Sequence, residues 1–447
     1  MLVRFAVQNY LSFNERTEFN MLTGFPRRLP HHVYHHGNLE LLKMAAIYGA
    51  NGAGKSNFIH ALVDLKHLAQ KGIMVLNSRK FKLNAISTEL PISFEIEFIV
   101  EEKMFLYILI VNNSIIESEK LSLTNPNGME DLIFERLFLD NKIKIDFNEI
   151  YKKNETDKLR IKLYEEELLS NDETLLSKLN DSREGFEIVK QAFKWFFQLN
   201  SLYPSITISN LILTMPDIHN FVKDYIAKFD TGIKDFEVLT FSLDQFFGTN
   251  NQQLKDKLKE ELKTKNPIDL SNFTNGKENV KSKTIVTIEK GEYVVKTLVT
   301  YHFNNKKEKI AFTPNEESDG TVRIWDLLSA LYFVLKQPCL ILIDEIDSSV
   351  HPALLKELII KFSENKETKG QLIFTTHESN LLDQEIFRQD EIWFAEKNDN
   401  GATELFPMSD FNIRYDLDIR KGYLNGRFGA IPFLSNFKNL NWKAHAE

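Results

Sequence analysis

One glycine-rich run combines residue types and spacing that could bind the phosphates of a nucleotide. Gly49-Ala50-Asn51-Gly52-Ala53-Gly54-Lys55-Ser56 fits the pattern G-x-x-x-x-G-K-[ST], between a run typical of a strand and one typical of a helix. Glycines let backbone N–H groups turn toward phosphate oxygens, and a helix N-terminus favours negative charge. Lys55 would neutralise the β and γ phosphates, and Ser56 would ligate Mg²⁺. We therefore predict a site for ATP and Mg²⁺ whose nucleotide-binding residues are Gly49, Asn51, Gly52, Gly54, Lys55, Ser56 and Asn57.

Two acidic residues, Asp344 and Glu345, end a later apolar run. In ATP-hydrolysing sites an aspartate at such a position holds the magnesium through water, and a neighbouring glutamate orients or deprotonates the attacking water. His377 follows the next apolar run, residues 371–376, where its side chain could hydrogen-bond the γ-phosphate. An Asp-Glu pair alone is a modest signal, but together with the glycine loop it predicts ATP hydrolysis. The expected catalytic residues are Glu345 and His377, and the expected metal ligands are Ser56 and Asp344.

Periodic segments around these motifs indicate how the chain would position them. The apolar run 43–49 is typical of a buried strand, and the segment from Lys55 predicts a helix because its apolar residues recur at spacings of three and four. The later segments alternate between helix and strand, over 321–336, 338–345, 352–362 and 371–378. Such alternation predicts an α/β fold with parallel strands flanked by helices.

Other segments indicate additional layers. Residues 2–8 alternate as a strand would, and the chain from residue 91 predicts a small antiparallel sheet that would cover the nucleotide side. From about 150 to 280 the chain is rich in charged residues and also has leucines at helical spacing. This pattern predicts an exposed helical insert. Its stripe of Leu254, Leu258 and Leu262 is too short for a long coiled coil, so packing on the body or a short dimer contact is expected.

The polar run 272–283 would end this insert, and strands over 283–290 and 296–303 would follow. The chain is therefore predicted to have three parts. They are an N-terminal ATPase lobe over 1–150, a helical insert over 151–283 that could contact a partner or a second copy, and a C-terminal ATPase lobe over 284–447.

The composition is that of a soluble globular protein and limits the function classes. The chain has 447 residues, of which 43% are hydrophobic and 26% charged, and its formal net charge is -8. This acidic balance disfavours non-specific binding of nucleic acid unless a local basic patch provides it. Cys339 is the single cysteine, so an internal disulfide is impossible and the thiol is expected in the core. Neither an apolar leader nor a run of about 18 apolar residues occurs, so we expect a cytoplasmic protein without membrane contact.

The order of the motifs resembles the ABC superfamily of ATPases. After the acidic pair, residues 347–352 read Asp-Ser-Ser-Val-His-Pro, similar to the turn called the D-loop in that superfamily. The resemblance implies that Asp347 contacts the opposite nucleotide site across a dimer. Residues 317–321, Glu-Ser-Asp-Gly-Thr, resemble the signature loop without its usual double glycine, so Ser318 and Gly320 would face a γ-phosphate bound by another subunit. A capping turn is the alternative for this loop.

Taken together, the start VRFAVQNYLSFNERTEF, the loop GANGAGKS, the runs ESDGT, LILIDEID and TTHES, and the end YLNGRFGAIP resemble the RloA and AbiL-type ATPases of bacteria. The members of this family carry the name AAA but are ATPases of the ABC class. The family is related more distantly to OLD-family, RecF and SMC ATPases. The resemblance implies an ABC-type P-loop ATPase head with a largely helical insert, acting in anti-phage defence or abortive infection. It also implies a homodimer or higher homo-oligomer through the ATP sites, a separately encoded effector that is a nuclease or toxin, and a nucleic-acid or phage-protein trigger.

Three other functions remain open on the residues alone. A RecF- or SMC-like DNA-repair ATPase would clamp DNA with the same heads, which the acidic balance and short insert disfavour. A transporter ATPase is disfavoured because the signature loop is irregular and no glutamine of the Q-loop type is evident after the first helix. A self-sufficient nuclease, as in OLD-family relatives, would need a further metal-binding domain, and only a short segment follows His377.

Two further patterns are interpreted as structural. The four histidines His31, His32, His35 and His36 match no standard zinc spacing and lack Cys or Asp partners, so a surface loop is expected. Residues 420–432 are basic and aromatic and could contact nucleic acid or a partner protein. A packed C-terminal segment is the favoured interpretation.

Overall fold

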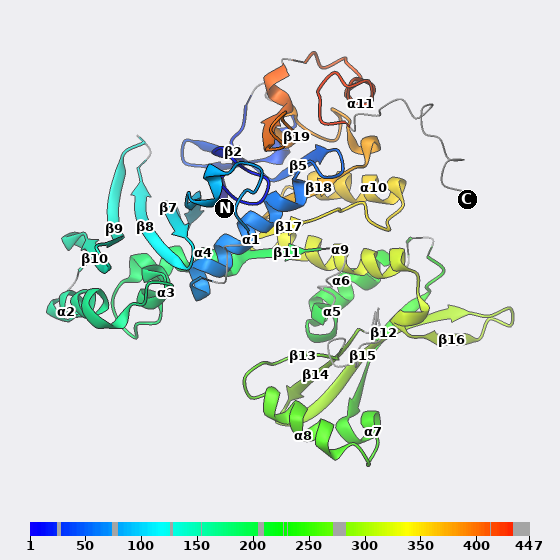
Figure 1. Ribbon diagram of the computed structural model, residues 1–447. Coiled ribbons are helices and arrows are strands. Elements are labelled where there is room, and N and C mark those ends of the chain that lie inside the picture. The colour runs from blue at the N-terminus through cyan, green and yellow to red at the C-terminus, as the bar shows by residue number, and fades with distance from the viewer. Residues whose placement is uncertain are drawn as a thin grey trace, which may run out of the picture. The chain divides into compact units, whose positions relative to one another are not determined.

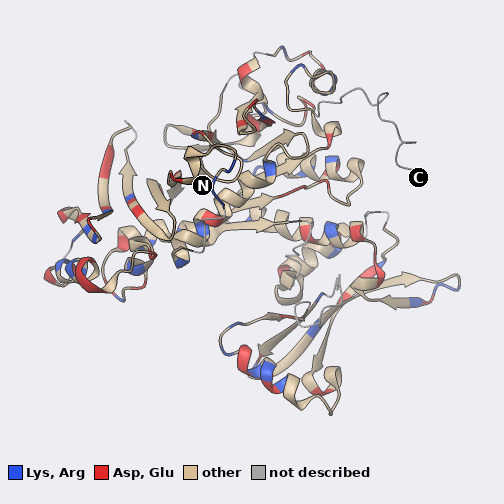
Figure 2. Ribbon diagram, viewed as in Figure 1, with Lys and Arg blue, Asp and Glu red and all other residues tan. Residues whose placement is uncertain are grey.

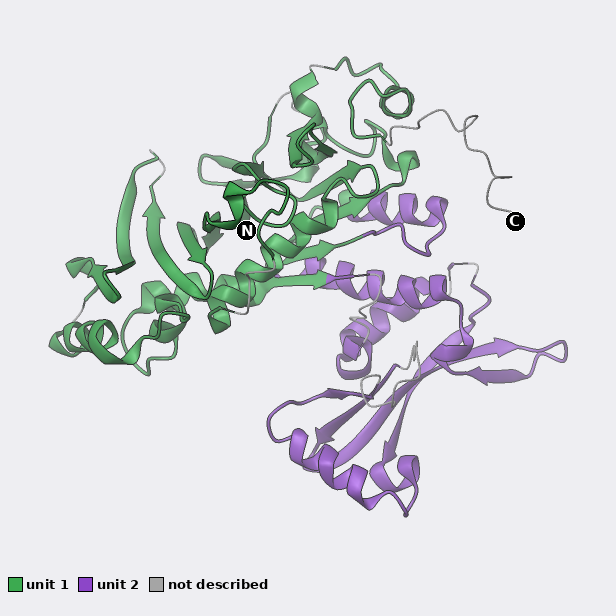
Figure 3. Ribbon diagram, viewed as in Figure 1, with its two compact units in different colours: residues 1–201, 338–344, 363–447 green, residues 202–337, 345–362 purple. Residues whose placement is uncertain are grey.

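The computed structural model describes residues 1–24, 28–73, 79–125, 128–152, 154–203, 210–226, 228–229, 231–270, 283–411 and 413–431. Figure 1 shows their ribbon. The chain forms two compact units, each made of segments that are distant in sequence (Figure 3). Unit 1 comprises residues 1–201, 338–344 and 363–447, and unit 2 comprises residues 202–337 and 345–362.

Unit 1 contains a mostly parallel sheet with the strand order β11-β17-β18-β5-β19-β20. Strands β17, β18, β5 and β19 pair in parallel, and β20 pairs antiparallel with β19. Strands β5, β17 and β18 are buried along their whole length, as parallel strands covered on both faces are. The bounds are β5 Met44–Gly49, β11 Leu199–Leu202, β17 Leu340–Ile343, β18 Gln371–Thr376, β19 Ile392–Lys397 and β20 Thr403–Pro407. The predicted parallel core is therefore confirmed.

A second sheet of unit 1 is antiparallel, with the order β10-β9-β8-β7-β6-β1-β2. Buried and partly exposed residues alternate along most of β6, as in a sheet with one face in the core. Strands β9 and β10 were not predicted, because charged residues interrupt the apolar alternation of EDLIFERLFL. The bounds are β1 Leu2–Gln8, β2 Thr17–Asn20, β6 Ile92–Val100, β7 Lys103–Asn112, β8 Ile115–Thr124, β9 Glu130–Leu139 and β10 Lys142–Phe147.

Helix α1, Lys55–Lys71, packs against both sheets of unit 1. The ring of Phe58 lies 5.8 Å from that of Phe5 in β1 and 4.8 Å from that of Phe19 in β2. Phe19 also contacts Trp393 of β19, with ring centroids 4.7 Å apart. Full burial of one such side chain contributes roughly 1.5–3 kcal/mol, so these contacts hold the helix firmly. The helix that starts at the glycine loop is thereby fixed by both sheets.

The first part of the predicted insert packs on the antiparallel sheet of unit 1. The buried carboxylate of Glu119 in β8 accepts the N–H groups of Leu175 and Leu176, at 2.6 and 2.9 Å, at the start of α3. It also accepts the hydroxyl of Tyr107 at 3.0 Å, and burial raises the pKa of Glu119. Trp195 of α4 stacks on Phe98 of β6, with centroids 4.7 Å apart. The helices of this part are α2 Glu155–Leu163, α3 Leu175–Asn180 and α4 Glu187–Gln198.

Unit 2 has an antiparallel sheet with the order β12-β15-β14-β13, and β16 also pairs with β15. Its strands are β12 Asp235–Ser242, β13 Ile268–Asp269, β14 Thr284–Glu289, β15 Glu292–Phe303 and β16 Lys309–Phe312. The helices are α5 Asn210–Thr214, α6 Pro216–Ile226, α7 Leu243–Phe247, α8 Gln252–Glu261, α9 Asp319–Lys336 and α10 Pro352–Ser363, the last residue of which belongs to unit 1.

The short leucine stripe of α8 is part of the core of unit 2. Leu258 and Leu262 are buried in a cluster with Val286 and Val295, and Leu254 packs against this cluster. Of the two expected roles, packing on the body is therefore confirmed.

The boundaries of the two compact units differ from the boundaries of the three predicted parts. Residues 151–201 lie in unit 1, and unit 2 begins at residue 202. The predicted end of the insert, residues 272–283, lies outside the described residues except for Lys283. The division into two ATPase lobes and an insert stays a prediction. The fold class is confirmed as α/β, with parallel and antiparallel sheets flanked by helices.

Candidate nucleotide site

The glycine-rich loop joins the end of β5 to the start of α1 in unit 1. Gly49 ends the strand, Lys55 begins the helix, and Gly54 is the residue before it. Gly52 and Gly54 have φ angles of 78° and 107°, a region that favours glycine because a Cβ would meet the backbone. Asn51 and Gly52 are exposed at the tip of the loop. The strand, the loop and the helix N-terminus thus have the arrangement of a phosphate-binding loop.

Lys55 is buried at the base of this loop, with only 6% of the residue exposed. Its Nζ donates to the carbonyl oxygens of Gly49 at 2.8 Å and Ala50 at 3.1 Å. These bonds keep the ammonium group inside the curve of the loop. The lysine is placed where the motif requires it, and its contact with phosphate stays a prediction.

A set of hydrogen-bonded side chains supports the loop, those of Ser12, Asn57 and Thr403. The Thr403 hydroxyl donates to Ala53 O at 2.7 Å and lies 2.8 Å from Ser12 Oγ. Asn57 Nδ2 donates to Ser12 Oγ at 2.8 Å, and the contact of Asn57 with nucleotide stays a prediction. A Cβ on Gly54 would come within 2.1 Å of Thr403 Oγ1, so close packing also requires glycine there. Ser12 and Thr403 are 391 residues apart, and no sequence spacing could have paired them.

Asp344 and His377 reach the same edge of the parallel sheet as the loop. The carboxyl ends of parallel strands meet at one edge, and β17, β18 and β5 end at Ile343, Thr376 and Gly49. Asp344 follows β17, is 6% exposed, and accepts a hydrogen bond of 2.6 Å from Thr375 Oγ1.

His377 directly follows β18 and is exposed. The structure therefore brings three of the predicted features together within unit 1, namely the glycine loop, Asp344 and His377. Thr375 was not singled out from the sequence, because a buried threonine in an apolar strand carries no motif.

The signature-like loop begins α9 in unit 2. Ser318 Oγ accepts the backbone N–H of Thr321 at 3.1 Å, so this residue caps helix α9. A Cβ on Gly320 would lie 2.6 Å from the carbonyl oxygen of Ser349, so this loop packs closely on the turn 345–350. Asp347 is half-buried in the same turn. A role for these residues toward the nucleotide of another subunit stays a prediction.

Glu345 also belongs to unit 2, and its side chain is exposed. Its backbone is left-handed, with a φ of 47°, which costs roughly 1–2 kcal/mol for a residue with a Cβ. Its carbonyl accepts the N–H of Ser348 at 2.9 Å and Nη2 of Arg323 at 3.2 Å. Arg323 was not predicted as a site residue.

The oxygen donors of Ser56 and Asp344 suit Mg²⁺, which prefers hard oxygen ligands. Both belong to unit 1, with Ser56 half-buried in the first turn of α1. The hydroxyl of Thr375 gives the Asp344 carboxylate the outer hydrogen bond that commonly orients a ligating group. The residues present therefore fit a magnesium ion held through Ser56 and Asp344.

The histidine-rich segment differs from the expected surface loop. It forms a 3₁₀ turn, Pro30–His32, and strand β3, Val33–His36. His32 is buried, and its Nδ1 lies 2.9 Å from both carboxylate oxygens of Glu391, whose pKa is raised by burial. Among the described residues, no cluster of three or more His, Cys, Asp or Glu could hold a metal ion. The surface-loop prediction fails because His32 finds an acidic partner 359 residues away.

The basic and aromatic C-terminal run is packed, as favoured from the sequence, over its described part, residues 420–431. Tyr423 of α11, Ile419–Leu424, stacks on Phe394 of β19 with ring centroids 5.7 Å apart, and Phe428 stacks on the same ring at 5.8 Å. Asp416 pairs with Arg414 at 3.1 Å, and Asp418 caps α11.

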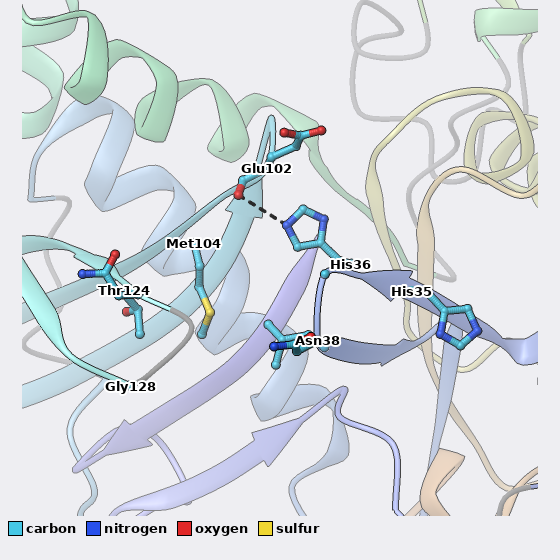
Figure 4. Close-up of a pocket in the computed structure, with 10 residues that line it drawn as sticks. His35, His36, Asn38, Glu102, Met104, Thr124 and Gly128 are labelled. Carbon is cyan, nitrogen blue, oxygen red and sulfur yellow. Dashed lines mark hydrogen bonds between the residues drawn. The ribbon is translucent and has the colours of Figure 1, made fainter.

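A cavity of about 660 Å³ lies beside the hairpin of β3 and β4, Leu39–Leu42, in unit 1 (Figure 4). His36 Nε2 lies 3.4 Å from the carbonyl oxygen of Glu102 at its wall. No residue of the glycine loop belongs to the lining, so the cavity is separate from the nucleotide site. The lining residues are His35, His36, Gly37, Asn38, Leu39, Glu102, Met104, Thr124, Asn125 and Gly128.

Solved structures similar to this chain include an SMC head domain from Thermotoga maritima, at 11% identity and a TM-score of 0.39, covering 91% of this chain and 98% of that chain. A second is an SMC head bound to the C-winged helix domain of ScpA, at 12% identity and a TM-score of 0.38, covering 92% of this chain and 99% of that chain. No curated protein matches the sequence. Among the helices of the described residues, none is both long and apolar enough to span a membrane.

A protein family matches residues 44–383, which is more than half of the chain. The matched segment contains the glycine loop, the signature-like loop, the acidic pair and His377. The family is described as "AAA domain, putative AbiEii toxin, Type IV TA system". The chain therefore belongs to this AAA-domain family.

Proposed function

We propose that the chain is an ATPase that hydrolyses ATP to ADP and phosphate. One observation carries this proposal: within unit 1, the loop that buries Lys55 and the carboxylate of Asp344 lie at the same edge of one parallel sheet. ATPases of the P-loop type place a cationic loop and a metal-holding carboxylate in this way. Membership of the AAA-domain family supports the same activity.

The groups of unit 1 would bind and orient the substrate. The N–H groups of the glycine loop and the ammonium group of Lys55 would hold the phosphates of ATP, and Ser56 and Asp344 would hold the magnesium ion. When bound, Mg²⁺ supplies positive charge that offsets the charge developing on the phosphates. Thr375 keeps the Asp344 carboxylate in one orientation through its 2.6 Å hydrogen bond.

Glu345 would act as the general base. Its carboxylate would take a proton from a water whose oxygen attacks the γ-phosphorus, while the bond from that phosphorus to the bridging oxygen breaks and leaves ADP. His377 would hydrogen-bond the γ-phosphate and respond to its loss. The exposure of both side chains supports these roles, because a group that meets substrate must be accessible.

A second copy of the chain would complete each site with Ser318, Gly320 and Asp347. The packing of Gly320 on the Ser349 carbonyl supports this proposal, because it places the signature-like loop beside the turn that holds Asp347 within unit 2. ATP would then favour a homodimer or higher homo-oligomer closed over two nucleotides, since it contacts both copies only in that state.

Two substitutions test the hydrolytic assignment. Glu345→Gln should keep ATP binding, lower hydrolysis by roughly 10²–10⁴-fold and trap the closed dimer, because the base is lost and the size is kept. Lys55→Ala should instead abolish ATP binding. Lys71→Ala, an exposed lysine at the other end of α1, is the matched control and should change neither property.

Phosphate release would measure hydrolysis, nucleotide titration would measure ATP binding, and light scattering would detect the closed dimer. Hydrolysis by Glu345→Gln at the parental rate would show that another group is the base.

We further propose that this ATPase regulates a separately encoded nuclease or toxin in a bacterial anti-phage system, with a nucleic acid or a phage protein as the trigger. The family description, which names a toxin and a toxin–antitoxin system, supports this role. In cells that carry the gene with its neighbours, Lys55→Ala should abolish protection against phage and Lys71→Ala should keep it. Equal plaque counts for parent and Lys55→Ala would contradict the proposal.

The distribution of charge supports a protein effector over a DNA clamp. Helices α2 and α8 each carry both acidic and basic residues, where a DNA-binding face would gather lysine and arginine (Figure 2). An ATP-dependent and salt-sensitive gel shift with duplex DNA would favour the clamp instead.

A further inference from the structure

Arg323 connects helix α9 to the turn that carries Glu345, within unit 2. Only 5% of Arg323 is exposed. Its Nη1 donates to the carbonyl oxygen of Tyr203 at 3.0 Å, and its Nη2 donates to that of Glu345 at 3.2 Å. One buried guanidinium group thus binds two main-chain segments that are far apart in sequence.

Glu345 needs such support because its backbone is left-handed, with a φ of 47°. A residue other than glycine persists in this region where its surroundings determine the conformation. Its carbonyl oxygen has two lone pairs, and it accepts hydrogen bonds from Ser348 N at 2.9 Å and Arg323 Nη2 at 3.2 Å. A rotation of this peptide group would break both bonds.

We propose that Arg323 is a positioning residue for ATP hydrolysis, which directs the Glu345 carboxylate by holding its main chain in the left-handed conformation. This role rests on the proposed function of Glu345 as the base. The backbone angles of Glu345 set the direction of its Cα–Cβ bond, so they set where the carboxylate can reach. Because a shift of about 1 Å at a reacting group costs roughly 10²-fold in rate, the conformation of this turn affects catalysis.

The geometry requires an arginine. A guanidinium group presents its N–H donors in a rigid planar fork, so one Nη reaches Tyr203 O while the other reaches Glu345 O. A lysine would keep the positive charge but has a single flexible ammonium group. Arg323→Lys should therefore weaken the bond to Glu345 without removing the buried charge.

The helix that carries Arg323 is itself anchored within unit 2. Asp326, one turn further along α9, pairs with Lys283 at 3.1 Å, and their side chains are 3% and 1% exposed. Lys283 directly precedes β14, so the pair ties α9 to the sheet of unit 2. A positioning residue requires such rigid support, because its own displacement would be passed on to the group it holds.

A double-mutant cycle between Arg323→Lys and Glu345→Gln in the full chain tests the proposal. Alone, Arg323→Lys should lower kcat roughly 10- to 100-fold and change the Kd for ATP by less than about threefold. In the Glu345→Gln background it should lower the residual rate by less than about twofold, because the base it positions is absent. Equal losses in both backgrounds, or no loss in the parent, would overturn the role.

Arg160→Lys is the matched control, because Arg160 Nη1 also donates to a main-chain carbonyl, that of Glu184, at 2.6 Å in unit 1. It should leave kcat within about twofold of the parent. Arg323→Gln is a second variant and should behave as Arg323→Lys does. If both Arg323 variants fail to fold while Arg160→Lys folds, the arginine is a structural requirement and the positioning role is rejected.

Amide hydrogen exchange separates this inference from the proposed ATPase activity. Without nucleotide, the Ser348 amide should exchange roughly tenfold faster in Arg323→Lys than in the parent, because its acceptor is no longer held. Unchanged exchange would overturn the inference even in an active ATPase. If the parent hydrolyses no ATP but the Ser348 amide responds, Arg323 still holds the main chain of this turn, and the hydrolytic function is rejected.

Discussion

Thr375 Oγ1 donates a hydrogen bond of 2.6 Å to Asp344 Oδ1, although the two residues are 31 positions apart. Parallel pairing brings them together, because β17 pairs with β18 and Asp344 directly follows β17. Both residues are buried, so the bond is protected from competition with water. The orientation of the proposed metal ligand is thus determined by the neighbouring strand.

Thr375→Val should weaken the use of Mg²⁺, because it removes this hydroxyl with little change in shape. We expect the Mg²⁺ concentration that gives half-maximal ATP turnover to rise roughly 10- to 100-fold. Thr368→Val is a matched control, since Thr368 is buried in the same unit and its hydroxyl donates to Asn365 O at 3.0 Å. The same magnesium dependence in Thr375→Val and in the control would show that Thr375 does not orient the ligand.

Gly54→Ala should be more damaging than Gly52→Ala. Both glycines have positive φ angles, so each alanine costs about 1–2 kcal/mol of backbone strain. At Gly54 the new Cβ would also lie 2.1 Å from Thr403 Oγ1, while at Gly52 it would meet nothing within 4 Å. Gly54→Ala should therefore abolish ATP binding and lower the free energy of unfolding by more than about 3 kcal/mol. Denaturant unfolding and nucleotide titration measure both effects, and equal results for the two variants would contradict the bracing by Thr403.

Asp326→Asn should destabilise the fold, because it leaves the buried ammonium group of Lys283 without its carboxylate. The expected loss in the free energy of unfolding is about 3–5 kcal/mol at neutral pH. The double variant Lys283→Met with Asp326→Leu carries no buried charge and should regain most of this stability. Urea unfolding of the three chains measures the differences, and parental stability of Asp326→Asn would show that the pair is dispensable.

The same pair predicts a dependence on pH. Burial lowers the pKa of Lys283, and the Asp326 carboxylate counters that shift. The unfolded chain therefore holds this proton more tightly than the folded chain, so the contribution of Lys283 to the free energy of unfolding should increase as pH rises toward the ordinary lysine pKa. The increase should be steeper in Asp326→Asn, where the counteracting carboxylate is absent. Unfolding at about pH 7 and about pH 10 compares the two chains, and equal slopes would show that Lys283 does not carry the effect.

Cys339 should be almost inert to alkylating reagents in the folded chain. Burial raises the pKa of its thiol to about 12, and the thiolate is the reactive form. At pH 8 the thiolate fraction would be roughly 10⁻⁴, against roughly 10⁻¹ for an ordinary thiol, so labelling should be roughly 10³-fold slower than in denaturant. Mass spectrometry measures the labelling, and rapid reaction of the folded chain would show an open environment. Because the folded pKa of Cys339 is raised, the contribution of this thiol to stability should fall as pH rises above the ordinary thiol pKa, and Cys339→Ala should remove that contribution to the pH dependence.

The local features of this protein can be predicted from its sequence. The spacing from Gly49 to Ser56 predicts a loop between a strand and a helix, and the structure places β5 and α1 there. The apolar run before Asp344 predicts a buried strand, which is β17. These predictions succeed because motif spacing and apolar periodicity depend only on residues that are close together in the sequence. Such local patterns can be recognised without knowing the fold.

The distant residues that support the site are known from the folded structure alone. It brings Thr403 to Ser12, pairs His32 with Glu391, and turns the Arg323 side chain onto the Glu345 carbonyl. It also directs the Asn57 amide to Ser12. None of these pairs has a characteristic spacing, because each forms where strands and helices from remote segments pack together. Such contacts depend on the burial of the whole core, and a buried polar group takes whichever partner that packing brings within hydrogen-bonding distance.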